Sequence, residues 1–449
     1  MADEAAIFVA IALGLLFFVI PLYLLTFRKK EEDEPQAEVK KEEVKKTEPN
    51  TSNSQKKLRN PVSKKKVQQN LNDNGINHPY LISSLKGHTG PITSLDFSDN
   101  GKLLASSSED RTVRLWNVKD FREKDHKYGR GNVEFDLASD VAFSPDSRAF
   151  VASLANEQKI RVFKIHKEKK ETGSTTMSIS PEFDFDKIHK SAIISVGISS
   201  TGKYIMTADK GTQIIIWSIK GEVYDKIDTL LMYNTFASIS PCGNLVAACG
   251  FTSEVKLWHM QFSKSGDFQQ TLKAFEIKGH RAGVLSFSFT NDSKRFATAS
   301  KDGTWKVWDI NVNYLKSQEA YLLSTGNFTG YEEGLNVNIA LTHDYFTVAL
   351  SVGSHLKYYD SKSGEMDEDI LHAHPGSICA LRWYTDSKIL VSSGGTDRML
   401  RVWENIHGAK ANLADLKEKL KRTTSASIKE RIEQQIEDYT KFLKKFNKV

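Results

Sequence analysis

The stretch from Gly279 to Ile310, GHRAGVLSFSFTNDSKRFATASKDGTWKVWDI, decides the fold of this chain. It opens with Gly279-His280 and closes with Trp308-Asp309, and between them lie three runs rich in β-branched and aromatic residues, SFSF, RFATAS and TWKVW. Asn, Asp, Ser and Gly separate the runs, and these residues accept the backbone angles of tight turns. The stretch therefore predicts three short strands, and so small a sheet needs further copies to bury its faces.

The pattern recurs seven times. Its closing aromatic residue returns after 47, 54, 41, 50, 51 and 44 residues, at Trp116, Phe163, Trp217, Trp258, Trp308, Tyr359 and Trp403. Repeats of roughly 40–50 residues with four strands each are typical of β-propellers. In this period, and in its Gly-His and Trp-Asp pairs, the chain resembles the WD-repeat β-propeller family. We expect an all-β fold, a seven-bladed propeller.

The finer spacing is more specific than the period. A histidine precedes the closing tryptophan by 28 or 29 residues in four repeats, and in three of these an aspartate precedes it by six and a hydroxyl by ten. The resemblance implies that these side chains hydrogen-bond in series, so that each buried polar group is satisfied. The three predicted complete sets are His88, Ser106, Asp110 and Trp116; His280, Thr298, Asp302 and Trp308; and His374, Ser393, Asp397 and Trp403.

Four repeats depart from this pattern. The third has Gly211 at the aspartate position and keeps the other three residues, which are His189, Thr207 and Trp217. The repeats that close with Phe163, Trp258 and Tyr359 have lost most of the pattern. We expect these four blades to depend on apolar packing alone and to open first in hydrogen exchange.

A His, an Asp and a Ser in one unit also suggest a catalytic triad. The set recurs in blade after blade, however, and a stabilising role explains this recurrence better than several active sites do. The sequence contains no Gly-rich phosphate loop, no GxSxG motif and no HExxH motif. We therefore predict that the protein is not an enzyme and has no catalytic residue, cofactor or metal.

The N-terminal region predicts a membrane anchor. Residues 5–27 form an apolar run of 23 residues without a charge, which is enough to cross a hydrocarbon layer of about 30 Å. Arg28, Lys29 and Lys30 follow at once, and the positive-inside rule then puts residues 1–4 in the lumen and the rest of the chain in the cytosol. Three cysteines at no disulfide or metal spacing agree with a reducing compartment.

The remaining boundaries follow from changes in composition. Residues 28–77 are rich in Lys, Glu, Asn and Ser and predict a disordered, charged tether. Residues 78–408 hold the seven repeats, and the run Tyr80 to Lys86 stands alone ahead of the first repeat. The family resemblance implies that this run completes the last blade and so closes the ring.

Residues 409–449 change to a helical period. Leu413, Leu416 and Leu420 share one face, and Ser427 to Glu430 reads as a capping box that opens a second helix. This second helix carries an apolar stripe from Ile428 to Phe446. The predicted helical hairpin packs on itself or on the propeller's underside, or its stripe docks a partner helix or a second copy of the chain.

Charge is distributed unevenly along the chain. The tether from Arg28 to Lys66 and the tail from Ala409 onward each carry a net +5, the first residues carry −2 and the whole chain carries +6, which leaves −2 on the propeller. This charge does not indicate nucleic-acid binding through a large basic face, although it leaves a local patch open.

The order of segments, with FSPDSRAF, SPCGNLVAACGF, FEIKGH and SKDGTWKVWD, is similar to one membrane-anchored branch of the family. That similarity implies the endoplasmic-reticulum membrane, a role in the unfolded-protein response and association with the stress-sensing kinase of that membrane. We predict a scaffold that binds membrane-associated proteins through loops such as those around Arg111, Arg281 and Arg398. The alternative is an RNA- or small-molecule-binding propeller at the same membrane.

Overall fold

A computed structural model describes residues 76–169 and 175–446 of the chain. The apolar run 5–27 and nearly all of the tether 28–77 lie outside these residues. Within the described ranges, no helix combines the length and apolar character needed to cross a membrane.

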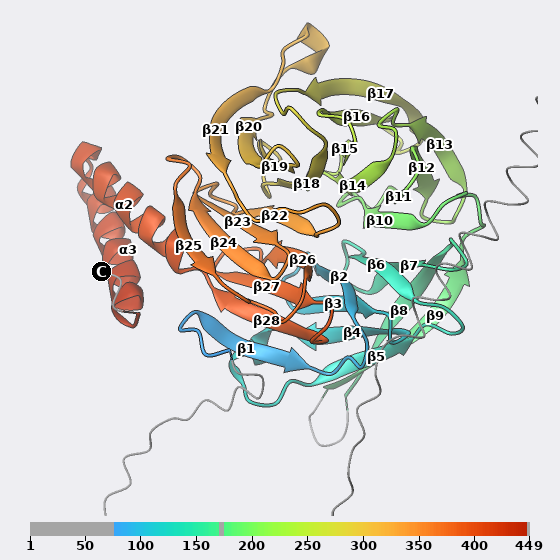
Figure 1. The fold of residues 1–449 in the computed structure, drawn as a ribbon, viewed down its shortest axis with the longest axis horizontal. Coiled ribbons are helices and arrows are strands. Elements are labelled where there is room, and N and C mark those ends of the chain that lie inside the picture. The colour runs from blue at the N-terminus through green and yellow to red at the C-terminus, as the bar shows by residue number, and fades with distance from the viewer. Residues whose placement is uncertain (1–75, 170–174, 447–449) are drawn as a thin grey trace, which may run out of the picture. The chain divides into compact units, whose positions relative to one another are not determined.

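The described chain forms seven four-stranded antiparallel sheets, or blades, arranged in a ring (Figure 1). Blade 1 consists of β2 (Ile92–Phe97), β3 (Leu103–Ser108), β4 (Thr112–Asn117) and β5 (Tyr128–Asn132), and blade 2 of β6 (Ala138–Phe143), β7 (Ala149–Leu154), β8 (Ile160–Lys169) and β9 (Thr175–Asp184). Blade 3 consists of β10 (Ile193–Ile198), β11 (Tyr204–Asp209), β12 (Gln213–Ser218) and β13 (Val223–Asp228), and blade 4 of β14 (Asn234–Ile239), β15 (Leu245–Gly250), β16 (Val255–Phe262) and β17 (Phe268–Ile277).

Blade 5 consists of β18 (Val284–Phe289), β19 (Arg295–Ser300), β20 (Thr304–Asp309) and β21 (Tyr321–Asn327), and blade 6 of β22 (Val337–Leu341), β23 (Thr347–Val352), β24 (His355–Asp360) and β25 (Met366–Ile370). Blade 7 consists of β26 (Ile378–Trp383), β27 (Ile389–Gly394), β28 (Met399–Glu404) and β1 (Leu81–Lys86). Two short 3-10 helices, η1 (Val118–Arg122) and η2 (Tyr314–Lys316), lie between the third and fourth strands of blades 1 and 5.

The sequence prediction of a seven-bladed propeller is confirmed. The stretch Gly279 to Ile310 forms β18, β19 and β20, and its two turns place Ser293 and Gly303 at positive φ. Strand β1 pairs antiparallel with β28, and Leu85 lies opposite Leu400. The first described strand thus closes the last blade, which removes an exposed sheet edge.

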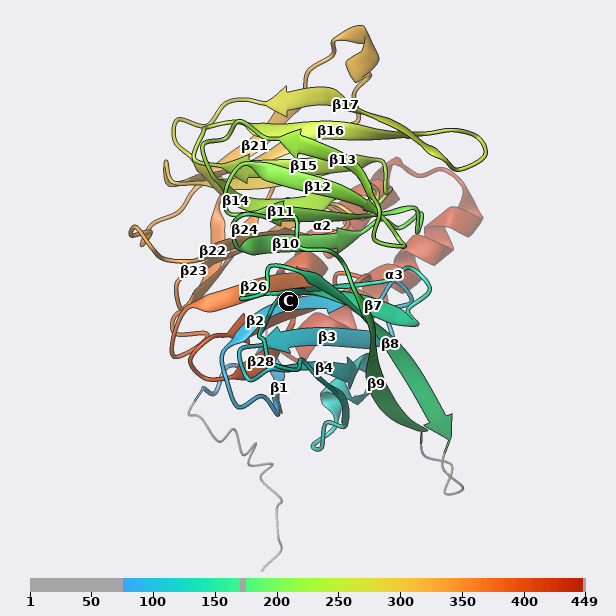
Figure 2. The ribbon, with the colours of Figure 1, turned by 90° about the vertical axis from the view of Figure 1, so that its right-hand side faces the viewer.

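The ring has two faces that differ in their loops. Two kinds of loop lie on one side of the ring: the loops that lead into the first strand of each blade and the loops that join its second and third strands. We call this side the top face. The opposite side is the bottom face, where the last residues of β8, the first residues of β9 and the β16–β17 hairpin project to the right in Figure 2. The top face points toward the viewer in Figure 1.

The core lies between neighbouring blades. Strands β3, β11, β15 and β23 are buried along their whole length, because adjacent blades cover both faces of these second strands. Clusters of buried side chains bridge blade to blade; one, for example, joins Leu115 of blade 1 to Phe150 and Phe163 of blade 2. Each blade therefore depends on its neighbours for burial of its apolar surface.

Polar side chains on the first strands also join adjacent blades. A side-chain oxygen on the first strand of one blade accepts a backbone N–H from the next blade in four places: Asp96 Oδ2 from Phe143 at 2.8 Å, Asp140 Oδ2 from Val196 at 2.7 Å, Ser195 Oγ from Ala237 at 3.1 Å and Ser288 Oγ from Leu341 at 3.2 Å. These bonds hold the innermost strands in register with one another.

Two helices follow the last blade, α2 (Ile406–Arg422) and α3 (Ala426–Lys444). Helix α2 begins three residues before the predicted boundary at 409, because the side chain of Asn405 accepts the Gly408 N–H at 2.8 Å and caps it. The predicted capping box was wrong, since Ser425 is the N-cap of α3 and Ser427 already lies inside the helix.

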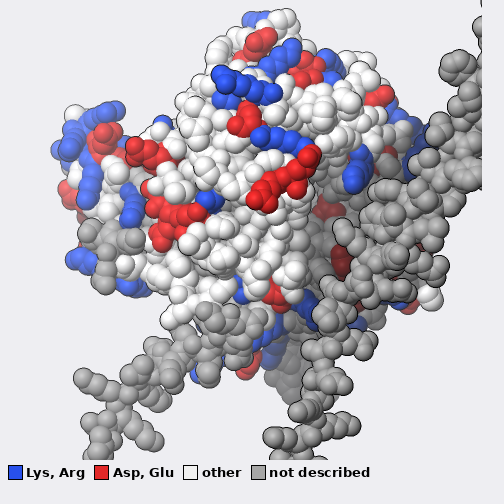
Figure 3. All heavy atoms as spheres, in the orientation of Figure 1, with Lys and Arg blue, Asp and Glu red and all other residues white. Residues whose placement is uncertain are grey.

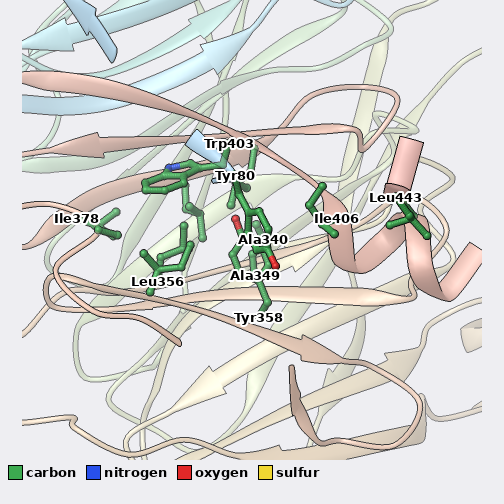
Figure 4. Packing of buried hydrophobic residues seen from close by; sticks show 14 of the residues in the cluster. Tyr80, Ala340, Ala349, Leu356, Tyr358, Ile378, Trp403, Ile406 and Leu443 are labelled. Carbon is green, nitrogen blue, oxygen red and sulfur yellow. The ribbon is translucent and has the colours of Figure 1, made fainter. Parts of the chain in front are cut away.

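The helical pair docks on the propeller. Ile406, Ala409 and Leu413 of α2 and Leu443 of α3 join a buried cluster with residues of blades 6 and 7, such as Tyr358. Figure 4 shows Ile406 and Leu443 beside this cluster. Asn412 also donates a hydrogen bond of 2.6 Å to Asp344, which lies in a bottom-face turn.

Most of the apolar stripe of α3 is therefore used within the chain. Ile436, Tyr439 and Phe446 pack against the same cluster, whereas Ile428 at the far end of the pair is half exposed. Of the two alternatives for the hairpin, the structure has the one in which it packs on itself and on the underside of the propeller. Self-association through these helices stays a prediction.

Candidate interaction surface on the top face

The predicted polar sets of blades 1 and 5 are brought together inside their blades. In blade 5, His280 Nδ1 lies 3.0 Å from Asp302 Oδ2, His280 Nε2 lies 2.7 Å from Thr298 Oγ1, and Trp308 Nε1 donates to Thr298 Oγ1 at 3.0 Å. Blade 1 repeats this arrangement with distances of 2.9, 2.8 and 2.9 Å between His88, Asp110, Ser106 and Trp116. Because the indole must donate, the hydroxyl donates to Nε2 and the histidine Nδ1–H donates to the carboxylate.

Blade 7 requires one correction. Ser392, and not Ser393, receives the Trp403 indole N–H at 2.8 Å and lies 2.7 Å from His374 Nε2. The loop between β27 and β28 is one residue longer than its counterpart in blade 1, so counting ten residues back from Trp403 reaches the wrong serine. His374 Nδ1 lies 2.8 Å from Asp397, as the spacing predicts.

Blade 3 requires the other correction. The sequence predicts an incomplete set there because Gly211 occupies the aspartate position. Asp209, two residues earlier, places its Oδ2 atom 3.2 Å from His189 Nδ1, and Thr207 Oγ1 lies 2.7 Å from His189 Nε2 and accepts from Trp217 at 2.8 Å. The set is therefore complete, and an aspartate at the end of the second strand was the missed signal.

The histidines of these sets lie in surroundings that favour their neutral form. Burial is the main cause that lowers the pKa of His88, His280 and His374, although a carboxylate lies beside each ring. A neutral ring is what the hydrogen-bond series needs, since Nε2 must accept a proton from the hydroxyl.

The carboxylates of these sets are held in their charged form. Burial opposes ionisation of Asp302, but hydrogen bonds from Thr304 and the Arg281 N–H, together with His280, lower its pKa to about 2. The same balance lowers the pKa of Asp110 and Asp397. These groups are buried and bonded to one another, so they cannot reach a substrate without opening the blade.

Two of the three blades without the set contain other polar anchors, so the expectation of apolar packing alone was wrong for these two. In blade 2, buried Asp136 accepts hydrogen bonds from the backbone of Leu137, Asn156 and Glu157. In blade 4, buried Lys256 donates to the Thr229 carbonyl at 3.0 Å. Both anchors fix loops of the top face.

The top-face loops expose large apolar side chains. Phe135 is 88% exposed, Leu230 70%, Met232 69% and Leu371 63%, and Phe251 is also exposed. Phe135, Leu230 and Met232 have positive φ values of 63°, 53° and 65°. Left-handed backbone is unfavourable for bulky residues, and such positions are typical of functional sites.

The loop that leads into blade 4, residues 229–234, shows how this conformation is held. Asn234 accepts from Thr229 Oγ1 at 2.8 Å and donates to the Asp209 carbonyl at 3.0 Å, while Lys256 Nζ lies 3.4 Å from the Leu230 carbonyl. Leu231 points inward and is fully buried. The loop is therefore clamped on both sides, and its clamp leaves Leu230 and Met232 in water.

Neighbouring loops extend this apolar area. The rings of Tyr233 and Phe251 lie 5.5 Å apart, and the Phe251 N–H bonds to the Tyr233 carbonyl at 3.2 Å. We call the group Leu230, Met232, Tyr233 and Phe251 the blade 4 patch. Sequence reasoning missed it; the signal was a run of apolar residues, TLLMY, at a position where the first and fifth repeats have Gly-His and small or polar residues.

The top face also carries charged residues. Arg111, Arg281 and Arg398, which the sequence pointed to, are all exposed in top-face loops. Figure 3 shows this face, with uncharged residues over much of it and charged side chains both in its upper middle and toward its edges. Exposed apolar side chains together with charged residues on one face are typical of protein-binding surfaces.

The described residues show no candidate metal centre. Within residues 76–169 and 175–446, no group of three or more His, Cys, Asp or Glu side chains could hold a metal ion. The cysteines in these ranges, Cys242, Cys249 and Cys379, are free thiols.

Comparisons with known proteins agree with this architecture. A family model described as "WD domain, G-beta repeat" matches residues 79–117, 270–309 and 368–404. These matches end in blades 1, 5 and 7, the three repeats in which the spacing of the polar set is complete or shifted by one residue.

The chain is 44% identical over 403 residues to transducin beta-like protein 2 of Mus musculus, which covers 89% of this chain and 88% of that protein. The Homo sapiens protein of that name is 44% identical over 383 residues, with coverage of 85% and 84%. Cross-pathway control WD-repeat protein 2 of Flammulina velutipes is 24% identical over 342 residues, with coverage of 72% and 96%. With this identity along most of its length, the chain belongs to the transducin beta-like protein 2 family of WD-repeat β-propellers.

Proposed function

We propose that this protein is a non-enzymatic scaffold that is anchored in a membrane and binds a partner protein through the top face of its propeller. The observation that carries this proposal is the blade 4 patch. Its loop keeps Leu230 and Met232 in an unfavourable backbone conformation and holds their side chains in water. Neither feature helps the fold, whereas both favour a preformed binding surface.

The size of the patch is suitable for a binding hot spot. Full burial of a Leu, Met or Phe side chain contributes about 1.5–3 kcal/mol, and a few such residues dominate most protein interfaces. The clamp formed by Lys256 and Asn234 reduces the entropy that binding must overcome. Arg281 is exposed in the loop that leads into the neighbouring blade 5, and it favours a partner with acidic residues at the edge of its contact surface.

The proposed anchor is the apolar run 5–27, with residues 1–4 in the lumen and the propeller in the cytosol. We place the protein in the endoplasmic-reticulum membrane and assign it to the unfolded-protein response, with the stress-sensing kinase of that membrane as a partner. These assignments rest on the resemblance to a membrane-anchored branch of the family and on the basic residues Arg28, Lys29 and Lys30.

Proximity labelling from the full-length protein in cells tests compartment and partner together. The expected labelled set contains endoplasmic-reticulum membrane proteins, including the stress kinase. A set without any protein of that membrane would contradict the assigned location. As a check on topology, the sequons at Asn291 and Asn327 should stay without glycans, because the propeller faces the cytosol.

The surface is tested in the same experiment with a matched pair of variants. Leu230→Asp combined with Met232→Asp should remove the partner from the labelled set, while Ile219→Asp should not. Ile219 is 53% exposed and lies in a bottom-face turn of blade 3, so it controls for an added surface charge. Equal labelling by both variants would exclude the blade 4 patch as the binding surface.

A further inference from the structure

The ring encloses a cavity at the bottom end of its central channel. Its volume is about 520 Å³, which lies within the range of about 300–1,000 Å³ that is usual for small-molecule sites. Residues of the first strands, and of the turns that follow them, line it in six of the seven blades. This cavity is separate from the top face, and the proposed scaffold function does not use it.

Three charged side chains on the first strands of adjacent blades line this cavity. Asp96 comes from blade 1, Asp140 from blade 2 and Arg382 from blade 7, which neighbours blade 1. The charge of Arg382 favours the ionised form of both carboxyl groups. Arg382 has no carboxylate within 4.0 Å among the described residues, and its guanidinium lies 5.9 Å from the centre of the Phe236 ring. Positive and negative groups are therefore present together without a direct ion pair.

The carboxylates are not required for joining the blades. Asp96 and Asp140 each accept an N–H from the next blade, but Ser195 and Ser288 do the same with a neutral hydroxyl in blades 3 and 5. A buried charge costs stability where a serine suffices. Burial raises the pKa of Asp96 to about 6, although the Phe143 N–H and Arg382 oppose this, so the environment does not fully compensate its charge.

We propose that the cavity binds a small zwitterion, with an ammonium group toward Asp96 and Asp140 and a carboxylate toward Arg382. This is the chemistry of a free amino acid or a short peptide. A guanidinium pairs with a carboxylate through two parallel hydrogen bonds, and a ligand of this kind satisfies both signs of charge at once. Phe236, Phe289 and Trp383 provide apolar walls for its carbon atoms.

The charges of the cavity also determine which zwitterion is preferred. Asp99 lines the cavity as well, so three carboxylates face a single guanidinium. A ligand with a net positive charge compensates this excess better than a neutral or acidic one. Arginine and lysine, free or in a dipeptide, should therefore bind more tightly than glutamate.

Isothermal titration calorimetry on the full-length chain in detergent tests this inference, with L-arginine, L-lysine, L-glutamate and the dipeptide Arg-Gly as probes. We expect binding of the basic probes and at least tenfold weaker binding of glutamate. Agmatine, which is arginine without its carboxylate, should also bind at least tenfold more weakly. Agmatine binding as tight as that of arginine would overturn the role of Arg382, and no binding of any zwitterion at millimolar concentration would overturn the site.

Three variants separate the site from the fold. Arg382→Met and Asp140→Ser should each weaken arginine binding at least tenfold; the serine keeps the hydrogen bond to the next blade, as Ser195 does in blade 3. Arg130→Met on the outer strand β5 should bind arginine like the wild type, because Arg130 is exposed and does not line the cavity. Unchanged arginine binding by both cavity variants would overturn the proposal. If Asp140→Ser does not fold, Asp96→Ser takes its place in the experiment. Tighter binding of Arg-Gly than of arginine would assign the site to peptides, and the reverse to free amino acids.

Discussion

Ser392 and Ser393 are neighbours in one strand, yet only Ser392 receives the Trp403 indole N–H. Successive side chains of a strand point to opposite faces of the sheet, so the hydroxyls of two neighbouring serines reach different hydrogen-bond partners. Ser393 accepts the Ala380 N–H instead. At the residue scale, a buried polar group is stabilised by its partner, and the exact register decides which residue has that partner.

Two buried tryptophans of blade 5 test this point. Trp308 donates its indole N–H to Thr298, whereas the indole nitrogen of Trp305 has no partner among the described residues. Both Trp→Phe changes leave a similar space, but only Trp308→Phe breaks a hydrogen bond. We expect Trp308→Phe to lower the free energy of unfolding by about 1–2 kcal/mol more than Trp305→Phe. Urea denaturation measures both, and equal losses would contradict the stabilising role of the set.

The histidine of the set predicts a pH effect. Burial lowers the pKa of His280 in the folded state, so below the unfolded pKa of about 6.5 the unfolded chain takes up a proton that the folded chain resists. The stabilising contribution of His280 is therefore complete above about pH 7 and decreases as the pH falls. The difference in unfolding free energy between wild type and His280→Gln should shrink from pH 7.5 to pH 5.5. A constant difference would show that the ring does not titrate in this way.

At the scale of elements, complete and incomplete blades alternate along the chain from blade 1 to blade 7, and the two end blades, both complete, are neighbours in the ring. Blades 1, 3, 5 and 7 contain the full set of His, hydroxyl, carboxylate and Trp, while blades 2, 4 and 6 do not. Each incomplete blade thus lies between two complete ones. Each less stable sheet is therefore packed between two more stable sheets, and in a repeat protein the stability of a repeat depends on its contacts with both neighbouring repeats.

Hydrogen exchange should follow this alternation. We expect amides of β7, β15 and β23 to exchange faster than those of β3, β11, β19 and β27, as read by mass spectrometry. Blade 3 is the informative case. The sequence alone predicts an incomplete polar set and fast exchange there, whereas the contact of Asp209 with His189 completes the set and predicts slow exchange. Asp209→Ala should make β11 exchange like β7, with little change in β3. Fast exchange of β11 in the wild type would contradict the assignment.

At the scale of the whole molecule, a single strand closes the ring. Strand β1 supplies the outer strand of blade 7, and Tyr80 just before it is buried in the cluster that also holds the helical pair. A chain that begins at residue 76 should therefore be soluble and monomeric. A chain that begins at residue 87 should aggregate, because β28 then presents an unpaired edge. Size-exclusion chromatography with light scattering distinguishes the two, and a soluble monomer that begins at residue 87 would rule out closure by β1.

The sequence by itself determined the number of blades and the helical tail, because strand period, turn residues and helical stripes are local patterns; the role of the closing strand came from the family resemblance. The spacing also gave all four residues of the polar sets in blades 1 and 5, since this spacing is fixed within one repeat. Only the tertiary structure decided that Asp209 and Ser392 complete two of these sets, because a longer loop shifts the serine in blade 7 and the last residue of β11 reaches the histidine in blade 3. It alone brought Asp96, Asp140 and Arg382 to one cavity and clamped Leu230 and Met232 outward, since these arrangements depend on contacts between blades or between a loop and a distant strand.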